Sequence, residues 1–146
     1  MIRYATPDDR EFYIEQMEQF YASPYVLHPI PHDAVVRNFD EAMRPDAFLE
    51  IFILEYEGKR VGFANVTKSY STEVGGKVIQ LEDIYMMPGY RNKGLGREYL
   101  KYLEQRFGGL VKRLRLEVEP SNTVAISLYE KLGYTELNYR QMIKDL

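Results

Sequence analysis

The stretch that decides the fold is Leu81–Phe107, which reads L-E-D-I-Y-M-M-P-G-Y-R-N-K-G-L-G-R-E-Y-L-K-Y-L-E-Q-R-F. Its apolar run Ile84–Met87 is typical of a strand, and Pro88 ends that strand because proline has no N–H to donate to a neighbour. A basic turn that contains glycine follows at residues 91–96, and apolar residues then recur at helical spacing. We therefore predict a strand, a glycine turn and a helix that begins at about Gly94.

This order of elements is the geometry of an anion site. The first backbone N–H groups of a helix have no internal partner, and the helix dipole adds partial positive charge at the same end. Glycine lacks the Cβ atom that would keep a phosphate away from these donors. Arg91, Lys93 and Arg97 add full positive charges around the turn. The sequence therefore predicts a phosphate-bearing ligand, with a diphosphate the best fit, on residues 91–97.

The turn lacks the side chains of two common phosphate motifs. Gly89 and Gly94 have the spacing of a nucleotide P-loop, but Leu95 and Gly96 stand where Lys and Ser or Thr should follow. The dinucleotide pattern also fails, because Tyr99 stands where its third glycine belongs. What remains is R-x-x-G-x-G after a strand, which resembles the acetyl-CoA-binding motif of the GCN5-related N-acetyltransferase (GNAT) family. Taken alone, the pattern also fits a glycine turn with solvated basic residues.

Length, charge and composition bound the class of protein. A chain of 146 residues fits one domain, so we expect residues 1–146 to form a single unit. The net charge of −3 argues against nucleic acid as the main partner. There is no cysteine, which excludes a disulfide framework and suits a reducing compartment. Neither a signal peptide nor an apolar run of membrane-spanning length is present, so we expect a cytoplasmic protein with no membrane partner.

Hydrophobic periodicity and turn residues predict the remaining elements. A helix between the strands at Val78–Met87 and Lys112–Val118 makes a right-handed crossover, so those strands should be parallel. The three strands before the crossover should form an antiparallel meander. The proline-rich segment 22–31 is apolar for a loop and should cover something. We expect strands at Met1–Ala5, Ala47–Tyr56, Arg60–Tyr70, Val78–Met87, Lys112–Val118, Tyr134–Leu137 and Gln141–Ile143, and helices at Pro7–Tyr21, Asp33–Met43, Gly94–Phe107 and Ser121–Leu132.

This order of elements matches the α/β (α+β) fold of the GNAT family over essentially the whole chain. That fold has a central mixed, mostly antiparallel twisted sheet of about seven strands flanked by about four helices, in the order strand, two helices, three strands, helix, strand, helix, two strands. The segment Leu116–Tyr134 resembles the second motif of the family. Its matching residues are Asn122, Ala125, Tyr129, Lys131 and Gly133. Because two independent segments agree, the chain is identified as a member of that family.

The resemblance implies acetyl-CoA as co-substrate. The turn should hold its diphosphate through backbone N–H groups. In the family, the strand before the turn parts from its parallel neighbour, and the pantetheine arm pairs with the exposed backbone there. Met86 N–H is the donor we expect for the thioester oxygen. The candidate cofactor-binding residues are Ile84, Tyr85, Met86, Arg91, Asn92, Lys93, Gly94, Leu95, Gly96, Arg97, Asn122 and Tyr129.

Two side chains are candidates for catalysis. An alkyl ammonium with a pKa of about 10.4 must lose a proton before it attacks, at a cost of about 4–5 kcal/mol at pH 7. Glu82 is the expected general base, directly or through a water; the alternative is a carboxylate that pairs with Lys or Arg. Strand parity places Asp83 on the other face of the sheet unless a bulge intervenes. Tyr129 is the expected acid for the departing thiolate; the alternative is a core residue in the helical stripe Ala125, Leu128, Tyr129, Leu132.

We therefore expect an acetyl-CoA-dependent N-acetyltransferase that acts on a primary amine by direct attack in a ternary complex. The acceptor is a small molecule or a peptide, and the L-E-D triplet is similar to that of polyamine and diamine acetyltransferases. The alternative is a non-catalytic acyl-CoA-binding sensor. No metal site is expected, because Pro29 and Pro31 keep His28 and His32 off a shared helix face. Segment 21–32 and the terminal strands should recognise the acceptor, and a homodimer through the sheet edge or those strands is left open.

Overall fold

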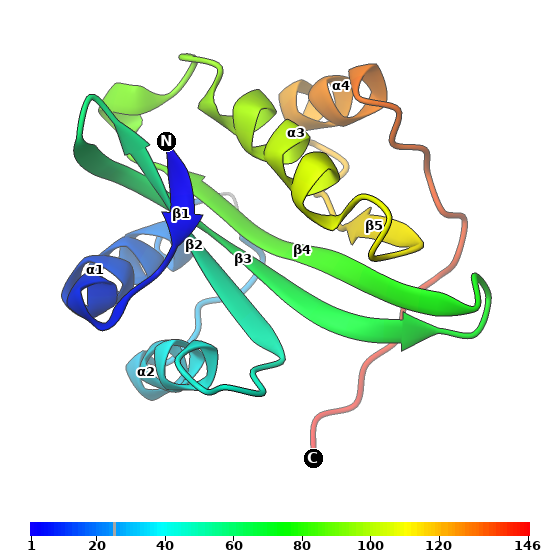
Figure 1. Ribbon diagram of the computed structural model, residues 1–146, viewed down its shortest axis with the longest axis horizontal. Coiled ribbons are helices and arrows are strands. Elements are labelled where there is room, and N and C mark those ends of the chain that lie inside the picture. The colour runs from blue at the N-terminus through cyan, green and yellow to red at the C-terminus, as the bar shows by residue number, and fades with distance from the viewer. Residues whose placement is uncertain (25) are drawn as a thin grey trace.

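The computed structural model describes residues 1–24 and 26–146, and its centre is one five-stranded sheet (Figure 1). The first four strands are antiparallel neighbours in chain order, and the fifth lies parallel to the fourth. The predicted meander and the predicted parallel crossover are therefore confirmed. The strands are β1 (Ile2–Tyr4), β2 (Leu49–Tyr56), β3 (Lys59–Ser71), β4 (Gly76–Met86) and β5 (Arg113–Leu116).

Helices cover both faces of the sheet, with α1 and α2 on one face and α3 and α4 on the other (Figure 1). None of the described helices is both long enough and apolar enough to span a bilayer. The α-helices are α1 (Arg10–Tyr21), α2 (His32–Ala42), α3 (Leu95–Phe107) and α4 (Thr123–Lys131). Two single-turn 3-10 helices, η1 (Pro7–Asp9) and η2 (Pro88–Tyr90), precede α1 and α3. Residue 25, in the segment expected to be a covering loop, lies outside the described residues.

Two apolar cores form because the central strands are buried on both faces. Along β2, Ile51 and Ile53 pack against α1 and α2, whereas Phe52 and Leu54 pack against α3. Successive strand residues point to opposite faces, so a strand that is covered twice must be apolar throughout. The mixed α/β fold class is therefore confirmed.

The prediction of two strands at the C-terminal end is wrong. After α4, no residue of the described chain is in a strand, so the sheet has five strands and not about seven. The segments Tyr134–Leu137 and Gln141–Ile143 have strand-like composition, but they pair with no neighbour here. Met142 and Ile143 are 90% and 89% exposed. Composition favours a strand only where a partner strand takes up the backbone N–H and C=O groups and an apolar face is covered.

Gly62 lets β3 approach β4 closely at the end of the sheet nearest η2. A Cβ atom at this position would lie 2.2 Å from the Tyr85 carbonyl oxygen and 3.0 Å from Met86 Sδ. There is therefore no room for a side chain at residue 62 while the last residues of β4 keep this position.

We predict that Gly62→Ala destabilises the fold by about 1–3 kcal/mol, because the added methyl group must push β4 away from β3. The free energy of unfolding in urea measures this change. Gly89→Ala is the matched control, since a Cβ atom at Gly89 would meet no atom within 4 Å. Equal unfolding free energies for the two variants would contradict the close approach.

Candidate active site

β4 loses its partner on one side before it ends. It pairs with β5 only from Val78 opposite Arg113 to Leu81 opposite Leu116. Its pairing with β3 continues to Met86. Within the described part of the chain, the last five residues of β4 therefore have a strand neighbour on the β3 side alone. We call the other side of this segment the open edge of β4.

The register shows which backbone groups face the open edge. Met87 N–H donates to the Val61 carbonyl oxygen at 2.9 Å, so it points toward β3. Backbone groups alternate between the two sides of an antiparallel strand. Ile84 and Met86 therefore face the open edge, whereas the backbone of Tyr85 faces β3 and its ring is buried among α1 and α2. Of the three strand residues expected to bind a cofactor, Ile84 and Met86 have backbone groups that face the open edge, whereas those of Tyr85 face β3.

The turn before α3 lies over this edge. Gly94 precedes the helix with a φ of +80°, and Asn92 has a φ of +62°. Among the described residues, no hydrogen bond is donated by the backbone N–H groups of residues 92–97. A Cβ atom at Gly94 would meet nothing within 4 Å, and one at Gly96 would lie 3.9 Å from Ile84 Cδ1. Unpaired amides beside an open strand edge fit a ligand that carries a diphosphate on an extended arm.

The positive charges of the turn do not all point to the same place. Arg91 Nε donates to the Met86 carbonyl oxygen at 3.1 Å. Lys93 Nζ lies 4.8 Å from the ring centroid of Tyr56 and 5.8 Å from that of Tyr90. Arg97 lies exposed in the first turn of α3. The positive side chains are therefore spread apart, whereas the unpaired backbone amides of residues 92–97 are grouped in the turn.

A β-bulge in β4 places two neighbouring carboxylates on one face. Asn65 pairs with Asp83, but the next residue, Val66, pairs with Leu81, so Glu82 is the extra residue. Leu81 packs in the core on the α3 side, whereas Asp83 bonds to Asn65 on the α1 side. Glu82 accepts a hydrogen bond from the Thr67 hydroxyl at 2.7 Å. Thr67 shares a face with Asn65 because the two are two residues apart in β3. The bulge therefore brings Glu82 and Asp83 together on the α1 side.

Asp83 is held by a side chain from each of two elements. The Tyr21 hydroxyl at the end of α1 donates to Asp83 Oδ1 at 3.1 Å. Asn65 Nδ2 donates to Asp83 Oδ2 at 2.7 Å, and the Asn65 residue is only 2% exposed. Neither Tyr21, the first residue of segment 21–32, nor Asn65 was predicted from the sequence to hold a carboxylate. A polar Asn within the apolar run V-G-F-A-N-V was the signal that could have found one of them.

Partial burial raises the pKa of both carboxylates. For Glu82, loss of hydration is the largest cause, and the charges of Asp83 and Glu117 act in the same direction. The Thr67 hydrogen bond and the charge of Arg115 act against this rise. For Asp83, burial raises the pKa, and the hydrogen bonds from Asn65 and Tyr21 oppose it. Glu82 is therefore a stronger base than an isolated glutamate, as proton transfer from an amine requires.

Tyr129 lies on the other face of the sheet. It is half-buried on α4, where it packs against the core under α3, and its ring centroid is 5.9 Å from that of Tyr134. Burial raises the pKa of its phenol, so the group is protonated at neutral pH. Asn122 caps α4, since its Oδ1 accepts from Ala125 N–H at 3.2 Å; the helix therefore begins at Thr123 and not at Ser121 as expected.

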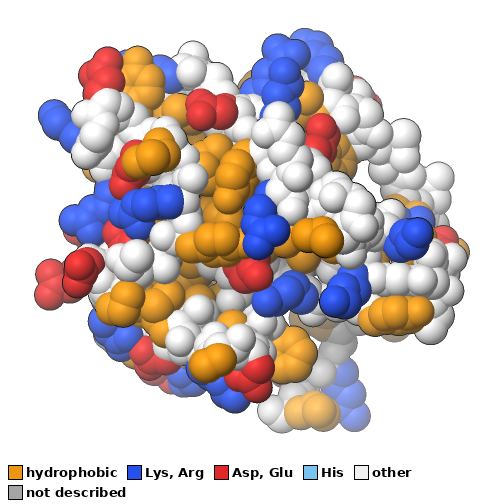
Figure 2. Space-filling model, in the orientation of Figure 1, with side chains coloured by type: hydrophobic (Ala, Val, Ile, Leu, Met, Phe, Trp, Pro, Cys, Tyr) orange, Lys and Arg blue, Asp and Glu red, His pale blue; other side chains and the backbone are white. Residues whose placement is uncertain are grey.

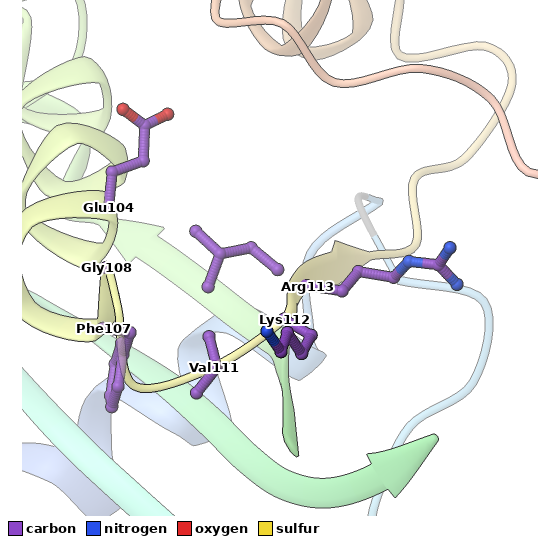
Figure 3. A pocket seen from close by; sticks show the side chains of 7 residues that line it. Glu104, Phe107, Gly108, Val111, Lys112 and Arg113 are labelled. Atoms are coloured by element: carbon purple, nitrogen blue, oxygen red, sulfur yellow. The ribbon is translucent and has the colours of Figure 1, made fainter. Parts of the chain in front are cut away.

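Two hollows lie near β5. One of about 200 Å³ is enclosed by the end of α3 and the segment leading into β5, with Phe107 and Val111 on its wall (Figure 3). The other, of about 460 Å³, reaches from the β3–β4 hairpin to Arg115 and Tyr139. The lining of the larger hollow includes Gln80 of β4 and Arg115 of β5, but neither Glu82 nor Asp83. On the face shown in Figure 2, acidic and basic side chains are interspersed, without a continuous basic stripe.

The two histidines lie in the part of the chain that the structure describes, and there they belong to no group of metal ligands. His32 Nδ1 pairs with Glu18 Oε1 at 2.5 Å, and His28 is exposed. Within residues 1–24 and 26–146, no three His, Cys, Asp or Glu side chains come together as metal ligands.

Comparison with known proteins gives a consistent family. The model of the acetyltransferase (GNAT) family matches residues 11–134. Thialysine N-epsilon-acetyltransferase from Bos taurus is 35% identical over 116 residues, covering 70% of this chain and 68% of that protein. Spermine/spermidine N(1)-acetyltransferase from Bacillus subtilis is 33% identical and covers 64% and 68%. The uncharacterized N-acetyltransferase YjgM from Escherichia coli is 33% identical over 60% of this chain, which spans only 52% of its length.

Solved structures share the fold over nearly the whole chain. An integron cassette protein from a salt-marsh metagenome, HFX_CASS3, is 27% identical with a TM-score of 0.81, and the match covers 99% of this chain and 90% of that one. The acetyltransferase AAC(6')-Iy, solved in complex with a CoA bisubstrate analogue, is 22% identical with a TM-score of 0.80, covering 100% and 97%.

Proposed function

The chain belongs to the acetyltransferase (GNAT) family, and from this premise we propose that it transfers an acetyl group from acetyl-CoA to a primary amine of a small molecule or a peptide. The observation that carries the proposal is the meeting of two sets of unpaired backbone donors, at the open edge of β4 and at the start of α3. Such an arrangement fits one ligand that combines a diphosphate with an extended, amide-bearing arm.

We propose that residues 92–97 hold the diphosphate through their backbone N–H groups, with Arg97 adding charge. The pantetheine arm then runs along the open edge and pairs with the backbone of Ile84 and Met86. Acetyl-CoA supplies the activated acetyl group as a thioester. Met86 N–H faces the open edge and is the donor for the thioester oxygen, where negative charge develops during attack. CoA in the structure of the related fold supports this choice of co-substrate.

Glu82 is the proposed general base and Tyr129 the proposed general acid. The elevated pKa of Glu82 suits it to take a proton from the acceptor ammonium, directly or through one water. The Tyr129 phenol gives its proton to the departing thiolate. The two residues lie on opposite faces of the sheet. An attack that passes through the opening between β4 and β5 would therefore have the base on one side and the acid on the other.

Cationic acceptors suit the charges on the α1 side. Glu82, Asp83 and Glu117 lie near one another with Arg115 as the opposing charge. Relatives are named as acetyltransferases of spermine and spermidine, of thialysine and of the alanine of ribosomal protein bS18. We propose an alkylamine of the polyamine kind as the first acceptor to test, within a thiol-release screen of polyamines, amino acids, aminoglycosides and N-terminal peptides.

We predict that Gly94→Asn weakens acetyl-CoA binding by at least about tenfold, or about 1.4 kcal/mol. Asn tolerates a positive φ, but its side chain would fill the space in front of the free amides. Gly75→Asn is the matched control: Gly75 has a φ of +62° in the β3–β4 hairpin, and a Cβ atom there would also meet nothing within 4 Å. Calorimetric titration of both variants with acetyl-CoA measures the effect. Equal affinities would remove the turn from the binding site.

We predict that Glu82→Gln lowers kcat/KM for the acceptor by about 10²–10⁴-fold and that Tyr129→Phe lowers kcat within the same range. Because the pKa of Glu82 is raised, wild-type kcat/KM should fall with decreasing pH at a value above that of an ordinary glutamate, about 4.3. The acid limb should disappear in Glu82→Gln. Thiol release followed across the pH range provides both readouts. If the protein binds acetyl-CoA tightly but acetylates no amine, the alternative function of a non-catalytic acyl-CoA-binding sensor would be favoured.

A further inference from the structure

We infer that Tyr21, Asp83 and Asn65 act as a register lock on the β4 bulge, and that Asp83 is a positioning residue which keeps Glu82 turned toward the acceptor. The inference rests on the proposed function, because it concerns the placement of the proposed base. It gives a role in the reaction to three residues that the family resemblance did not identify.

A bulge is the point at which a strand has a choice of register. One residue of β4 is left over opposite the pair Asn65 and Val66, and that residue is Glu82. If the extra position moved by one residue, the side chains between the old and new positions would turn to the other face. Apolar residues resist such a slip because one face would then expose them. Glu82 and Asp83 are both polar, so apolar burial distinguishes poorly between these two positions.

The hydrogen bonds of Asp83 determine which of the two residues, Glu82 or Asp83, is the bulged one. Asn65 is the direct cross-strand partner of Asp83, and their side chains bond at 2.7 Å, which fixes the register beside the bulge. Tyr21 bonds to the other carboxylate oxygen from α1 at 3.1 Å, which fixes the face. With Asp83 fixed in both respects, Glu82 is left as the bulged residue and bonds to Thr67.

The same bonds argue against Asp83 as the base itself. Each of its two oxygens already accepts a donor, and Asn65 is nine-tenths buried beside it. Glu82 has one such bond, from Thr67, and is exposed. The two adjacent carboxylates therefore divide their tasks: Asp83, the less exposed one, holds the strand, and Glu82, the more exposed one, meets the acceptor.

Substitutions at Asp83 can separate geometry from charge. Asn65 Oδ1 has no hydrogen-bond partner among the described residues. In Asp83→Asn, rotation of the Asn65 amide would offer that oxygen to the new amide group, while Tyr21 would still have an acceptor. The lock then survives without the negative charge. Asp83→Ala removes both.

The test measures kcat, KM and pH profiles for thiol release. We expect Asp83→Ala to lower kcat by about tenfold or more with the KM for acetyl-CoA unchanged, and Asp83→Asn to keep kcat within about threefold of the wild type while the KM for a cationic acceptor rises, because one of the charges that face the acceptor is lost. The groups that face Glu82 are Thr67 from β3, Asp83 on its own strand, Tyr21 from α1, and Arg115 and Glu117 in and after β5. Removing the Asp83 charge should therefore move the acid limb of kcat/KM to lower pH.

If Asp83→Ala does not fold, Tyr21→Phe tests the same hydrogen-bonded group with a smaller change. It deletes one hydroxyl, and Tyr4→Phe is the matched control, because Tyr4 also donates to a carboxylate, Glu50 Oε2, at 3.4 Å. We expect Tyr21→Phe to lower kcat about fivefold and Tyr4→Phe to leave it unchanged.

The inference is overturned if Asp83→Asn is as impaired as Asp83→Ala at every pH, because the charge itself is then required. It is also overturned if Tyr21→Phe and Tyr4→Phe are indistinguishable from the wild type. Glu82→Gln separates these failures from that of the proposed function. If Glu82→Gln retains full activity, the proposed base is wrong; if it loses activity while the lock variants do not, only the positioning role is wrong.

Discussion

Among the described strands, β4 has a neighbour on one side only past Leu81, and the whole candidate site depends on this constraint. A strand edge in the middle of a fold is normally closed by another strand or covered by a helix. Here β5 stops at Leu116, and α3 begins above the edge with Gly96 close to Ile84. Unpaired groups of two kinds of secondary structure therefore face the same space. Any ligand that satisfies one set lies within reach of the other.

The surrounding fold makes this opening rigid. Both faces of β2 and β3 are packed, and a shift of these inner strands would disturb both cores. Because Gly62 has no Cβ atom, the end of β4 can lie close against β3. The bulge then turns Glu82 and Asp83 toward α1, away from the face on which Tyr129 packs. Groups that the proposed reaction needs on opposite sides are placed there by the backbone alone.

Much of this arrangement could be predicted from the sequence, because it depends on local patterns. The strand, turn and helix of residues 84–107 follow from proline, glycine and helical spacing, and the parallel β5 follows from the handedness of crossovers. The terminal strands could not be predicted correctly, since their composition does not reveal whether a partner is present. The shared face of Glu82 and Asp83 was also out of reach, because strand parity holds only until a bulge interrupts it.

Asn65 shows why such a site departs from the most stable sequence. A buried amide costs about 1–3 kcal/mol unless it is hydrogen-bonded, and a half-buried carboxylate raises the same difficulty. Asn65 Nδ2 and one oxygen of Asp83 bond across the strand pair, and Tyr21 donates to the other carboxylate oxygen, while Asn65 Oδ1 has no partner among the described residues. Apolar residues at these positions would pack with less risk, but they would leave the bulge free to shift. The polar contacts therefore favour specificity over stability. They reduce the packing slightly, but they define a single register of β4.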